Sequence, residues 1–150
     1  MIENIPRCGI GVMIVKNNKV LLGRRKGSHG SGEFAFPGGH MEYMESFKDC
    51  ALRELSEECG KDFKVKNIQF VTLANVMAYN PKHYVLIGLS AEWESGEPKV
   101  MEEEKCEGWD WYDFNNFPQP LFQPTEIILK CYWDGMPYLD SSEVLEYLKK

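Results

Sequence analysis

The sequence predicts an α/β fold, α+β in type, in which helices form a sandwich around a mixed β-sheet. Apolar, β-branched runs separated by turn residues predict several strands. Segments with capping residues and helical spacing predict helices that pack on the sheet. The chain has 150 residues, of which 43% are hydrophobic and 13% aromatic, so it suits one domain with a single core over residues 1–150.

The N-terminal third predicts short strands joined by turns. Residues 9–16 are apolar and β-branched, and the two asparagines at 17–18 offer a turn into a second strand at 20–22. Residues 26–32 form a glycine-rich loop. A short strand at 33–36 then stops at a Pro-Gly-Gly run.

A helix is predicted to begin after Ser46, a good N-cap residue that has Asp49 three positions on. Gly60 ends the helix as the residue after its C-cap. The apolar stripe that we expect to face the core is formed by Phe47, Cys50, Ala51 and Leu55.

The rest of the chain predicts three more strands and two more helices. Strands are expected near 63–78, 83–91 and 108–112, and we assign the tryptophans of the last one to structure. Residues 124–132 open with a proline and predict a helix that packs on the sheet. Residues 142–150 predict a short, exposed terminal helix.

The chain is acidic, with a net charge of −6 and a pI near 5.1. Nucleic-acid binding depends on Lys and Arg that neutralise phosphates, so we expect no nucleic-acid partner. A polyphosphate substrate would need a bridging cation and a few local basic groups. Arg24, Arg25 and Lys26 could supply the basic groups.

The sequence also predicts a cytoplasmic protein without a membrane partner. No segment has the roughly 20 unbroken apolar residues of a spanning helix. The first residues lack the regions of a secretory signal. The five cysteines are an odd, scattered set without the spacing of a metal finger, which is typical of reduced thiols.

The most informative feature is the pattern G-x5-E-x7-R-E-L-x-E-E-x-G from Gly39 to Gly60. Glu54, Glu57 and Glu58 fall at i, i+3 and i+4, so they share one face of the predicted helix. Clustered carboxylates resist ionising together unless a cation lies among them. Oxygen ligands of this kind suit Mg²⁺ or Mn²⁺, so the pattern predicts a hard-metal site that handles phosphates.

This pattern resembles the Nudix box, the signature of hydrolases that act on a nucleoside diphosphate linked to another moiety. The resemblance covers roughly residues 6 to 135 and implies a Nudix-type α/β/α sandwich, with residues 136–150 as a C-terminal extension. Further runs are similar to the MutT-like branch: Leu22-Gly23-Arg24-Arg25, Phe36-Pro37-Gly38-Gly39-His40, the segment from Glu104 to Asp113, and Pro120-Leu121-Phe122. A solvated acidic helix face is the simpler explanation of three glutamates, but it does not require Gly39, Glu45 and Arg53 at matching distances.

The resemblance implies the metal site and its catalytic residues. Glu54, Glu57 and Glu58 match the ligands of Mg²⁺, for which Mn²⁺ can substitute, and Glu57 is our first choice to accept a proton from the attacking water. Arg53 matches the residue that holds the glutamates through ion pairs. The carbonyl of Gly38 matches a backbone ligand. A further ligand from a later loop matches Glu104 best, with Glu102, Glu103 and Glu107 as rivals.

The resemblance also implies substrate contacts, for which we predict Arg25, Phe36, Gly38, Gly39, His40 and Phe122. Arg25 is expected to contact the phosphates, and a solvent-exposed strand end is the alternative for it. Phe36 and Phe122 match positions that sandwich a base, and core packing competes with that role. His40 is either a contact or a turn residue. Leu86 and Asn75 align with pocket positions, whereas His29 and His83 are expected at the surface or in structural roles.

Two positions depart from the branch. Position 61, normally aliphatic, is Lys61, and Phe63 is expected to bury in its place. Position 123 is Gln123 where similar members have Trp, so a stacking surface is missing and the base preference is open.

The resemblance therefore implies a Mg²⁺-dependent enzyme that splits a nucleoside triphosphate into the monophosphate and pyrophosphate. An oxidised purine such as 8-oxo-dGTP is the leading substrate. Dihydroneopterin triphosphate, pyrimidine deoxynucleotides and isoprenyl diphosphates are alternatives, as is a catalytically silent nucleotide-binding module. A homodimer is expected by analogy with similar members, and the partner is otherwise a small molecule.

Overall fold

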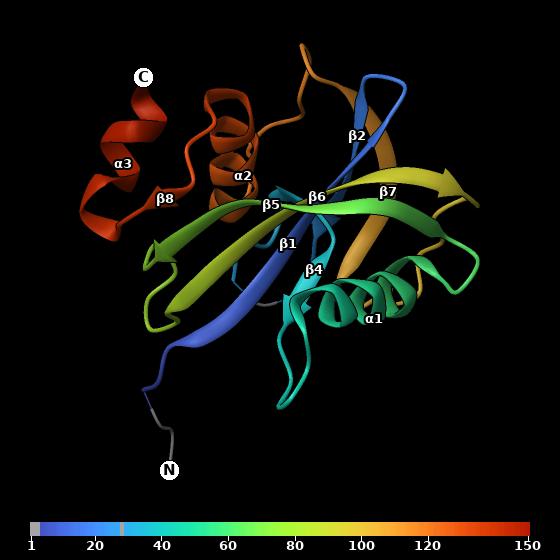
Figure 1. Cartoon of the computed structure of the whole chain (residues 1–150), viewed down its shortest axis with the longest axis horizontal. Coiled ribbons are helices and arrows are strands. Elements are labelled where there is room, and N and C mark those ends of the chain that lie inside the picture. Colours follow the sequence, from blue (N-terminus) through green and yellow to red (C-terminus); the bar gives the residue numbers. More distant parts are fainter. Residues whose placement is uncertain (1–3, 28) are drawn as a thin grey trace.

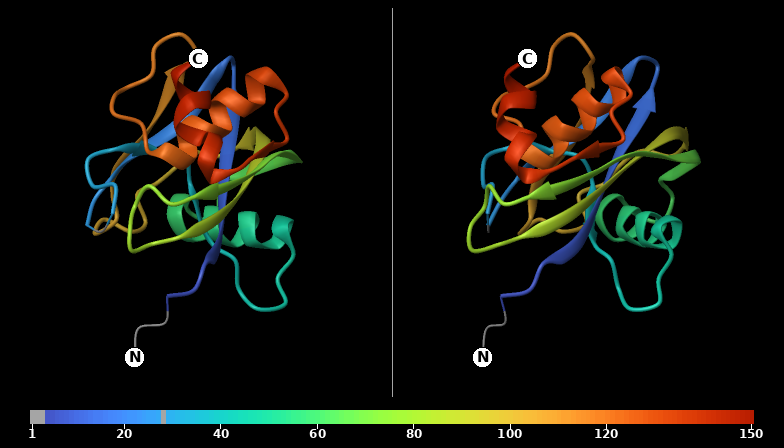
Figure 2. Two further views of the ribbon diagram at one scale, coloured as in Figure 1. Left: turned by 90° about the vertical axis from the view of Figure 1, so that its left-hand side faces the viewer. Right: turned by 60° about the vertical axis from the view of Figure 1, so that its left-hand side comes forward.

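The chain forms one mixed sheet with helices on both faces, in a computed structural model that describes residues 4–27 and 29–150 (Figure 1). Helix α1 (Phe47–Cys59) covers one face. Helices α2 (Gln123–Asp134) and α3 (Ser141–Lys149) lie together on the other face, as Figure 2 shows. The predicted α+β sandwich is confirmed.

The eight-stranded sheet has the order β3-β2-β1-β6-β5-β8, with β4 paired to β1 and β7 paired to β2. Strands β1 and β6 run parallel, as do β5 and β8, and the other pairs are antiparallel. The strands are β1 (Arg7–Lys16), β2 (Lys19–Arg25), β3 (Phe34–Ala35), β4 (Gly38–His40), β5 (Lys64–Val76), β6 (Tyr84–Ser95), β7 (Cys106–Asp113) and β8 (Tyr138–Leu139).

Strand β1 changes partner along its length. Its end pairs with β2, where Val15 faces Val20, whereas its first half pairs with β4, where Gly9 faces His40. Because β2 and β4 leave β1 at different points, the sheet opens between them. The candidate site described below lies at this opening.

Alternate residues of β1 enter two separate cores. Ile10, Val12 and Ile14 pack with α1, whereas Met13 packs with α2. On the α2 side, Gly11 and Gly88 are paired across β1 and β6. A Cβ on Gly11 would lie 2.7 Å from Cδ1 of Ile128, and one on Gly88 would lie 2.8 Å from its Cγ1. The two glycines therefore let α2 approach the sheet closely.

The caps of α1 are confirmed. The Asp49 backbone N–H donates to Ser46 Oγ over 3.1 Å, and Gly60 follows the helix with a φ of 98°. Phe47 was wrongly expected in the apolar stripe, since it is 49% exposed and the buried stripe is formed by Cys50, Ala51, Leu55 and Cys59. Phe63 is buried, as expected from Lys61.

Two short strands were not predicted. Strand β4 forms from the Pro-Gly-Gly run itself, which we expected only to end the preceding strand. Strand β8 joins β5 where Leu73 faces Tyr138, so the C-terminal segment adds to the main sheet. The terminal helix is also less exposed than expected, because Val144 of α3 is buried against α2 and β5.

None of the helices in the described part of the chain is long and apolar enough to cross a membrane. All five cysteines are free thiols.

Candidate active site

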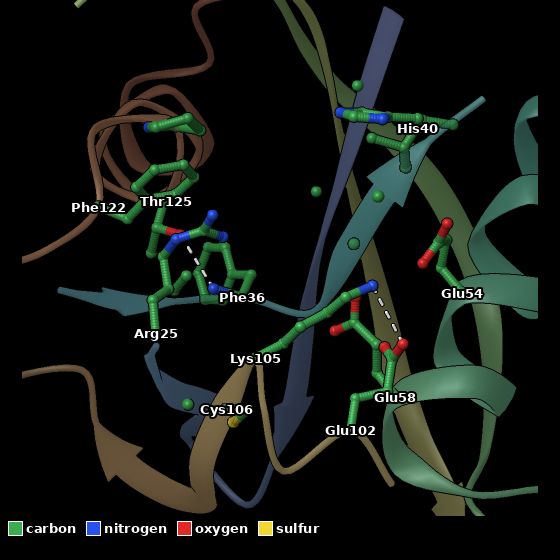
Figure 3. A pocket seen from close by; sticks show the side chains of 18 of the residues that line it. Arg25, Phe36, His40, Glu54, Glu58, Glu102, Lys105, Cys106, Phe122 and Thr125 are labelled. Atoms are coloured by element: carbon green, nitrogen blue, oxygen red, sulfur yellow. Dashed lines mark hydrogen bonds and ion pairs between the residues drawn. The ribbon is translucent and has the colours of Figure 1, made fainter. Parts of the chain in front are cut away.

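The opening between β2 and β4 is a cavity of about 660 Å³. Its walls come from β1, β2, β4, α1, the turn before β7 and the start of α2. Figure 3 shows carboxylates along one side and aromatic rings with Arg25 along the other. The cavity thus combines an acidic end with an aromatic end.

Arg53 is the hub of the acidic end. Its Nε and Nη2 donate to the two carboxylate oxygens of Glu45, over 2.6 and 3.1 Å. Its Nη1 donates to Glu54 over 2.9 Å and to Glu57 over 3.3 Å, and Nη2 also reaches the His40 carbonyl over 2.9 Å. Arg53 therefore ties the loop before α1 to the glutamates on the helix, as its predicted role requires.

Charge pairing lowers the proton affinity of Glu45. The hydrogen bonds from Arg53, with one from the Glu42 backbone N–H, lower the pKa of Glu45 to about 2. The hydrogen bonds that Arg53 donates to Glu45, more than those it donates to Glu54 and Glu57, raise the pKa of Arg53. The pair therefore stays ionised and keeps its geometry across the neutral range.

Glu58 has the opposite environment. Burial, followed by the charges of Glu54 and Glu102, raises the pKa of Glu58 to about 8. Burial also raises the pKa of Glu54. The Gly38 backbone hydrogen bond acts against the shift at Glu58 without cancelling it. The half-buried carboxylates of Glu54 and Glu58 thus lie near the charge of Glu102, and the nearby positive charge does not cancel the repulsion among the three.

Gly38 and Gly39 have steric roles at this end. A Cβ on Gly38 would overlap the Ile10 carbonyl oxygen of β1, so only glycine lets β4 lie this close. A Cβ on Gly39 would overlap the carboxylate of Glu54. The glycines of the pattern therefore make room for the sheet and for a glutamate.

The donor set fits a divalent cation. Clustered carboxylate oxygens that repel one another are the ligands that hard cations prefer. In residues 4–27 and 29–150, no three His, Cys, Asp or Glu side chains already converge as a metal site. Arg53 donates hydrogen bonds to carboxylate oxygens of Glu54 and Glu57, and Lys105 donates one to Glu102 over 3.1 Å. These ion pairs therefore use the same oxygens that would bind a cation.

The acidic run before β7 contributes Glu102 and Glu104 to the cavity lining. Glu102 is the one whose charge acts on both Glu54 and Glu58. Glu104 is exposed. Glu107 instead pairs with Arg24 over 3.3 Å.

Arg25 lies at the aromatic end. Its guanidinium stands 4.0 Å from the ring centre of Phe122, and its Nε donates to the His29 carbonyl over 3.2 Å. Burial lowers its pKa, while the charge of Glu58 acts in the opposite direction. Arg25 is therefore a half-buried cation inside the cavity and not a wet strand end.

A stack of three rings forms part of the aromatic wall. Tyr84 lies between His29 and His40, with ring centres 5.5 and 5.4 Å away and interplanar angles of 24° and 28°. Burial, followed by the charge of Arg25, lowers the pKa of His29 to about 4. His40 and His29 thus both line the cavity, and His29 is half-buried against Tyr84 in the ring stack.

Tyr79, in the loop between β5 and β6, packs beside the aromatic wall and holds this loop in place. Its ring centre is 4.9 Å from that of Phe122, and its hydroxyl donates to Glu33 over 2.8 Å. The Gln123 backbone N–H donates to the same hydroxyl over 2.9 Å. Tyr79 and Tyr84 were missed in the sequence, although both flank the Asn-Pro turn that separates two predicted strands.

The other predicted contacts divide between cavity and core. Phe36 lines the cavity but is buried in the α2-side core, and its N–H donates to Thr125 Oγ1 over 2.9 Å. Leu86 also lines the cavity. The side-chain oxygen of Asn75 instead accepts a hydrogen bond from His83 Nε2, which makes a structural pair. Of the two tryptophans of β7, Trp109 lines the cavity and donates to the Glu58 carbonyl over 3.2 Å.

The sequence and fold match one family. A NUDIX domain model matches residues 6–130. The chain is 32% identical over 124 residues to the ADP-ribose pyrophosphatase of Methanocaldococcus jannaschii, which covers 82% of this chain and 71% of that protein. It is 30% identical over 107 residues to the NAD-capped RNA hydrolase NudC of Pseudomonas fluorescens, of whose length it spans 36%.

Solved structures show the same fold. A MutT NUDIX hydrolase from Burkholderia pseudomallei superposes with a TM-score of 0.78 and 31% identity, over 84% of this chain and 97% of that chain. The cavity with its glutamates lies within the matched residues. The chain therefore belongs to the Nudix family and is a hydrolase of phosphorus-containing anhydrides.

Proposed function

We propose that this chain is a Mg²⁺-dependent pyrophosphohydrolase that splits a nucleoside triphosphate into the monophosphate and pyrophosphate. The observation that carries the proposal is the group of half-buried Glu58, Glu54 and Glu102, which line one end of a cavity that has aromatic rings at the other. Such a cavity suits a ligand with a polyphosphate at one end and a ring system at the other.

The proposed ligands of the cation are Glu54, Glu57 and Glu58, with the Gly38 carbonyl and one glutamate of the turn before β7. Glu102 is better supported for that last position than Glu104, because its charge acts on both Glu54 and Glu58 and Glu104 is exposed. A cation bound there offsets charge on the phosphate oxygens and lowers the pKa of the attacking water.

The reaction adds water across one P–O–P linkage. The water oxygen bonds to the β-phosphorus, the monophosphate leaves with the electron pair of the broken bond, and a carboxylate takes the proton. Glu57 remains our first choice for that carboxylate, since it is half exposed to the cavity and oriented by Arg53. Arg25 and His40 are proposed to bind the substrate between the phosphates and the ring system.

The leading substrate is an oxidised purine triphosphate such as 8-oxo-dGTP. ADP-ribose is the second candidate, because a relative with 32% identity is an ADP-ribose pyrophosphatase. Phe122 is already covered by Arg25 and Tyr79, so the proposed base contact shifts towards Tyr84 and His40.

A substrate panel tests the proposal. Purified protein is incubated with Mg²⁺ and 8-oxo-dGTP, dGTP, pyrimidine deoxynucleotides, dihydroneopterin triphosphate, isoprenyl diphosphates, ADP-ribose and NAD-capped RNA, and the products are identified by mass. We expect monophosphate and pyrophosphate from a triphosphate, and no product with EDTA. Tight binding without turnover of any compound would instead favour a silent nucleotide-binding module.

Two further expectations belong to this proposal. The five free cysteines are consistent with a reducing, cytoplasmic location. A homodimer is proposed by analogy alone, and light scattering of the purified protein tests it by measuring the molar mass.

A further inference from the structure

Lys105 lies at the acidic end of the cavity, where hydrogen bonds hold its backbone and its side chain extends into solvent. Its N–H donates to the Glu102 carbonyl over 2.9 Å, and its own carbonyl accepts from the Lys26 N–H over 2.9 Å. The next N–H, of Cys106, also reaches the Glu102 carbonyl. The side chain is nevertheless 67% exposed, so the turn positions an ammonium that can still move.

The ammonium lies among the carboxylates. Its Nζ is 3.1 Å from Glu102 Oε2, the contact drawn in Figure 3. Glu102, then Glu58 and Glu54, raise the pKa of Lys105. Lys105 and His40 both line the cavity.

The arginines that line the cavity are engaged elsewhere. Arg53 uses all three of its nitrogens on carboxylates and the His40 carbonyl. Arg25 is stacked on Phe122 at the far end. Among the described residues, Lys105 Nζ donates a hydrogen bond to one carboxylate only, that of Glu102. Because an ammonium has three N–H donors, two of them have no protein acceptor in this part of the chain. Donors are thus available beside the place where the proposed function puts a diphosphate.

We propose that Lys105 is a phosphate-binding residue of this site, and this rests on the proposed function. Without a divalent cation its ammonium serves as the counter-ion of Glu102. Once a cation neutralises the carboxylates, the ammonium turns its donors to the non-bridging oxygens of the scissile diphosphate. The charge-assisted bonds then offset negative charge where the P–O–P linkage breaks.

The test separates phosphate binding from metal binding with Lys105→Gln. Calorimetry measures Mn²⁺ alone and then inorganic pyrophosphate in saturating Mn²⁺, so neither readout needs turnover. We expect pyrophosphate to bind about tenfold more weakly to the variant, with Mn²⁺ affinity equal or higher because a competing cation is gone. Lys105→Arg keeps the charge and should restore pyrophosphate affinity to within about threefold.

Lys61→Gln is the matched control, since it removes the same charge from an exposed position outside the cavity lining. It should leave both affinities unchanged. An unchanged pyrophosphate affinity in Lys105→Gln would overturn the proposal, as would wild-type protein that does not bind pyrophosphate with Mn²⁺. A parallel loss of Mn²⁺ affinity would overturn it too, because Lys105 would then act only by placing Glu102. Wild-type protein that binds pyrophosphate through Lys105 but hydrolyses nothing would contradict the proposed function alone.

Discussion

Gly39 lies directly against the carboxylate of Glu54, so close that a Cβ at position 39 would overlap the carboxyl carbon and both oxygens. This contact joins the first residue of the sequence pattern to one of its proposed metal ligands. It gives a physical reason for glycine at a position where the backbone φ does not demand one.

Gly39→Ala should therefore displace Glu54 and disturb the metal site without unfolding the protein. We expect kcat to fall at least about tenfold and Mn²⁺ to bind more weakly, because the ligand can no longer occupy its place. Gly108→Ala is the control, since a Cβ there meets nothing within 4 Å. Normal kcat in Gly39→Ala would show that the position of Glu54 does not matter for the reaction.

Glu57→Gln tests the proposed proton acceptor. We expect kcat to fall at least about a hundredfold, equivalent to about 2.7 kcal/mol of barrier, with a much smaller change in substrate binding. Glu42→Gln is a matched control because Glu42 is an exposed partner of the same Arg53 Nη1, at 3.6 Å. Steady-state kinetics measure kcat for both variants. If kcat of Glu57→Gln stayed near that of Glu42→Gln, Glu57 would be excluded as metal ligand and as base.

The Glu45–Arg53 pair predicts a pH dependence of stability. The folded protein holds the pKa of Glu45 at about 2, below its ordinary value of 4.5. The stabilisation is therefore fully present above pH 4.5 and is lost as the pH falls towards 2.

Chemical unfolding of wild type and Glu45→Gln between these limits measures the effect. The difference in free energy of unfolding should shrink as the pH falls, because protonated Glu45 resembles Gln. A difference that is constant with pH would show that the ion pair contributes nothing specific.

Glu102→Gln and Glu104→Gln distinguish the two candidates for the ligand from the turn before β7. We expect Glu102→Gln to weaken Mn²⁺ binding about tenfold, or about 1.4 kcal/mol, because the charge of Glu102 acts on both Glu54 and Glu58. Glu104→Gln should change the affinity by less than about twofold. Titration followed by the electron paramagnetic resonance of Mn²⁺ measures both, and the reverse order would assign the role to Glu104.

The close approach of α2 to the sheet predicts a stability effect that can be rescued. Gly11→Ala should cost about 1–3 kcal/mol of unfolding free energy, because the new Cβ lies 2.7 Å from Ile128 Cδ1. Ile128→Val removes that methyl group, so the double variant should lose less than the sum of the single changes. Additive losses in denaturant unfolding would show that the two side chains do not compete for space.

The helix and its glutamates could be predicted from sequence because their evidence is local. Ser46, Gly60 and the spacing of Glu54, Glu57 and Glu58 act within one element. The aromatic wall could not be predicted in this way. His29 and Tyr84 meet only because β6 runs parallel to β1 and places its first residue beside the glycine-rich loop.

Solvent exposure was also harder to predict than helix position. Phe47 is the first residue of α1, where it follows the apolar spacing but stays about half exposed to solvent. Strand β4 depends on Gly38, whose contact with Ile10 exists only after β1 is in place. Residues distant in the chain decided both features.

The most direct test of the account is anomalous diffraction at the manganese edge from crystals soaked in Mn²⁺, with and without a nucleotide. The account predicts a peak among the carboxylates of Glu54, Glu57 and Glu58, next to Gly38. Well-ordered crystals with no peak beside these side chains in either state would contradict it.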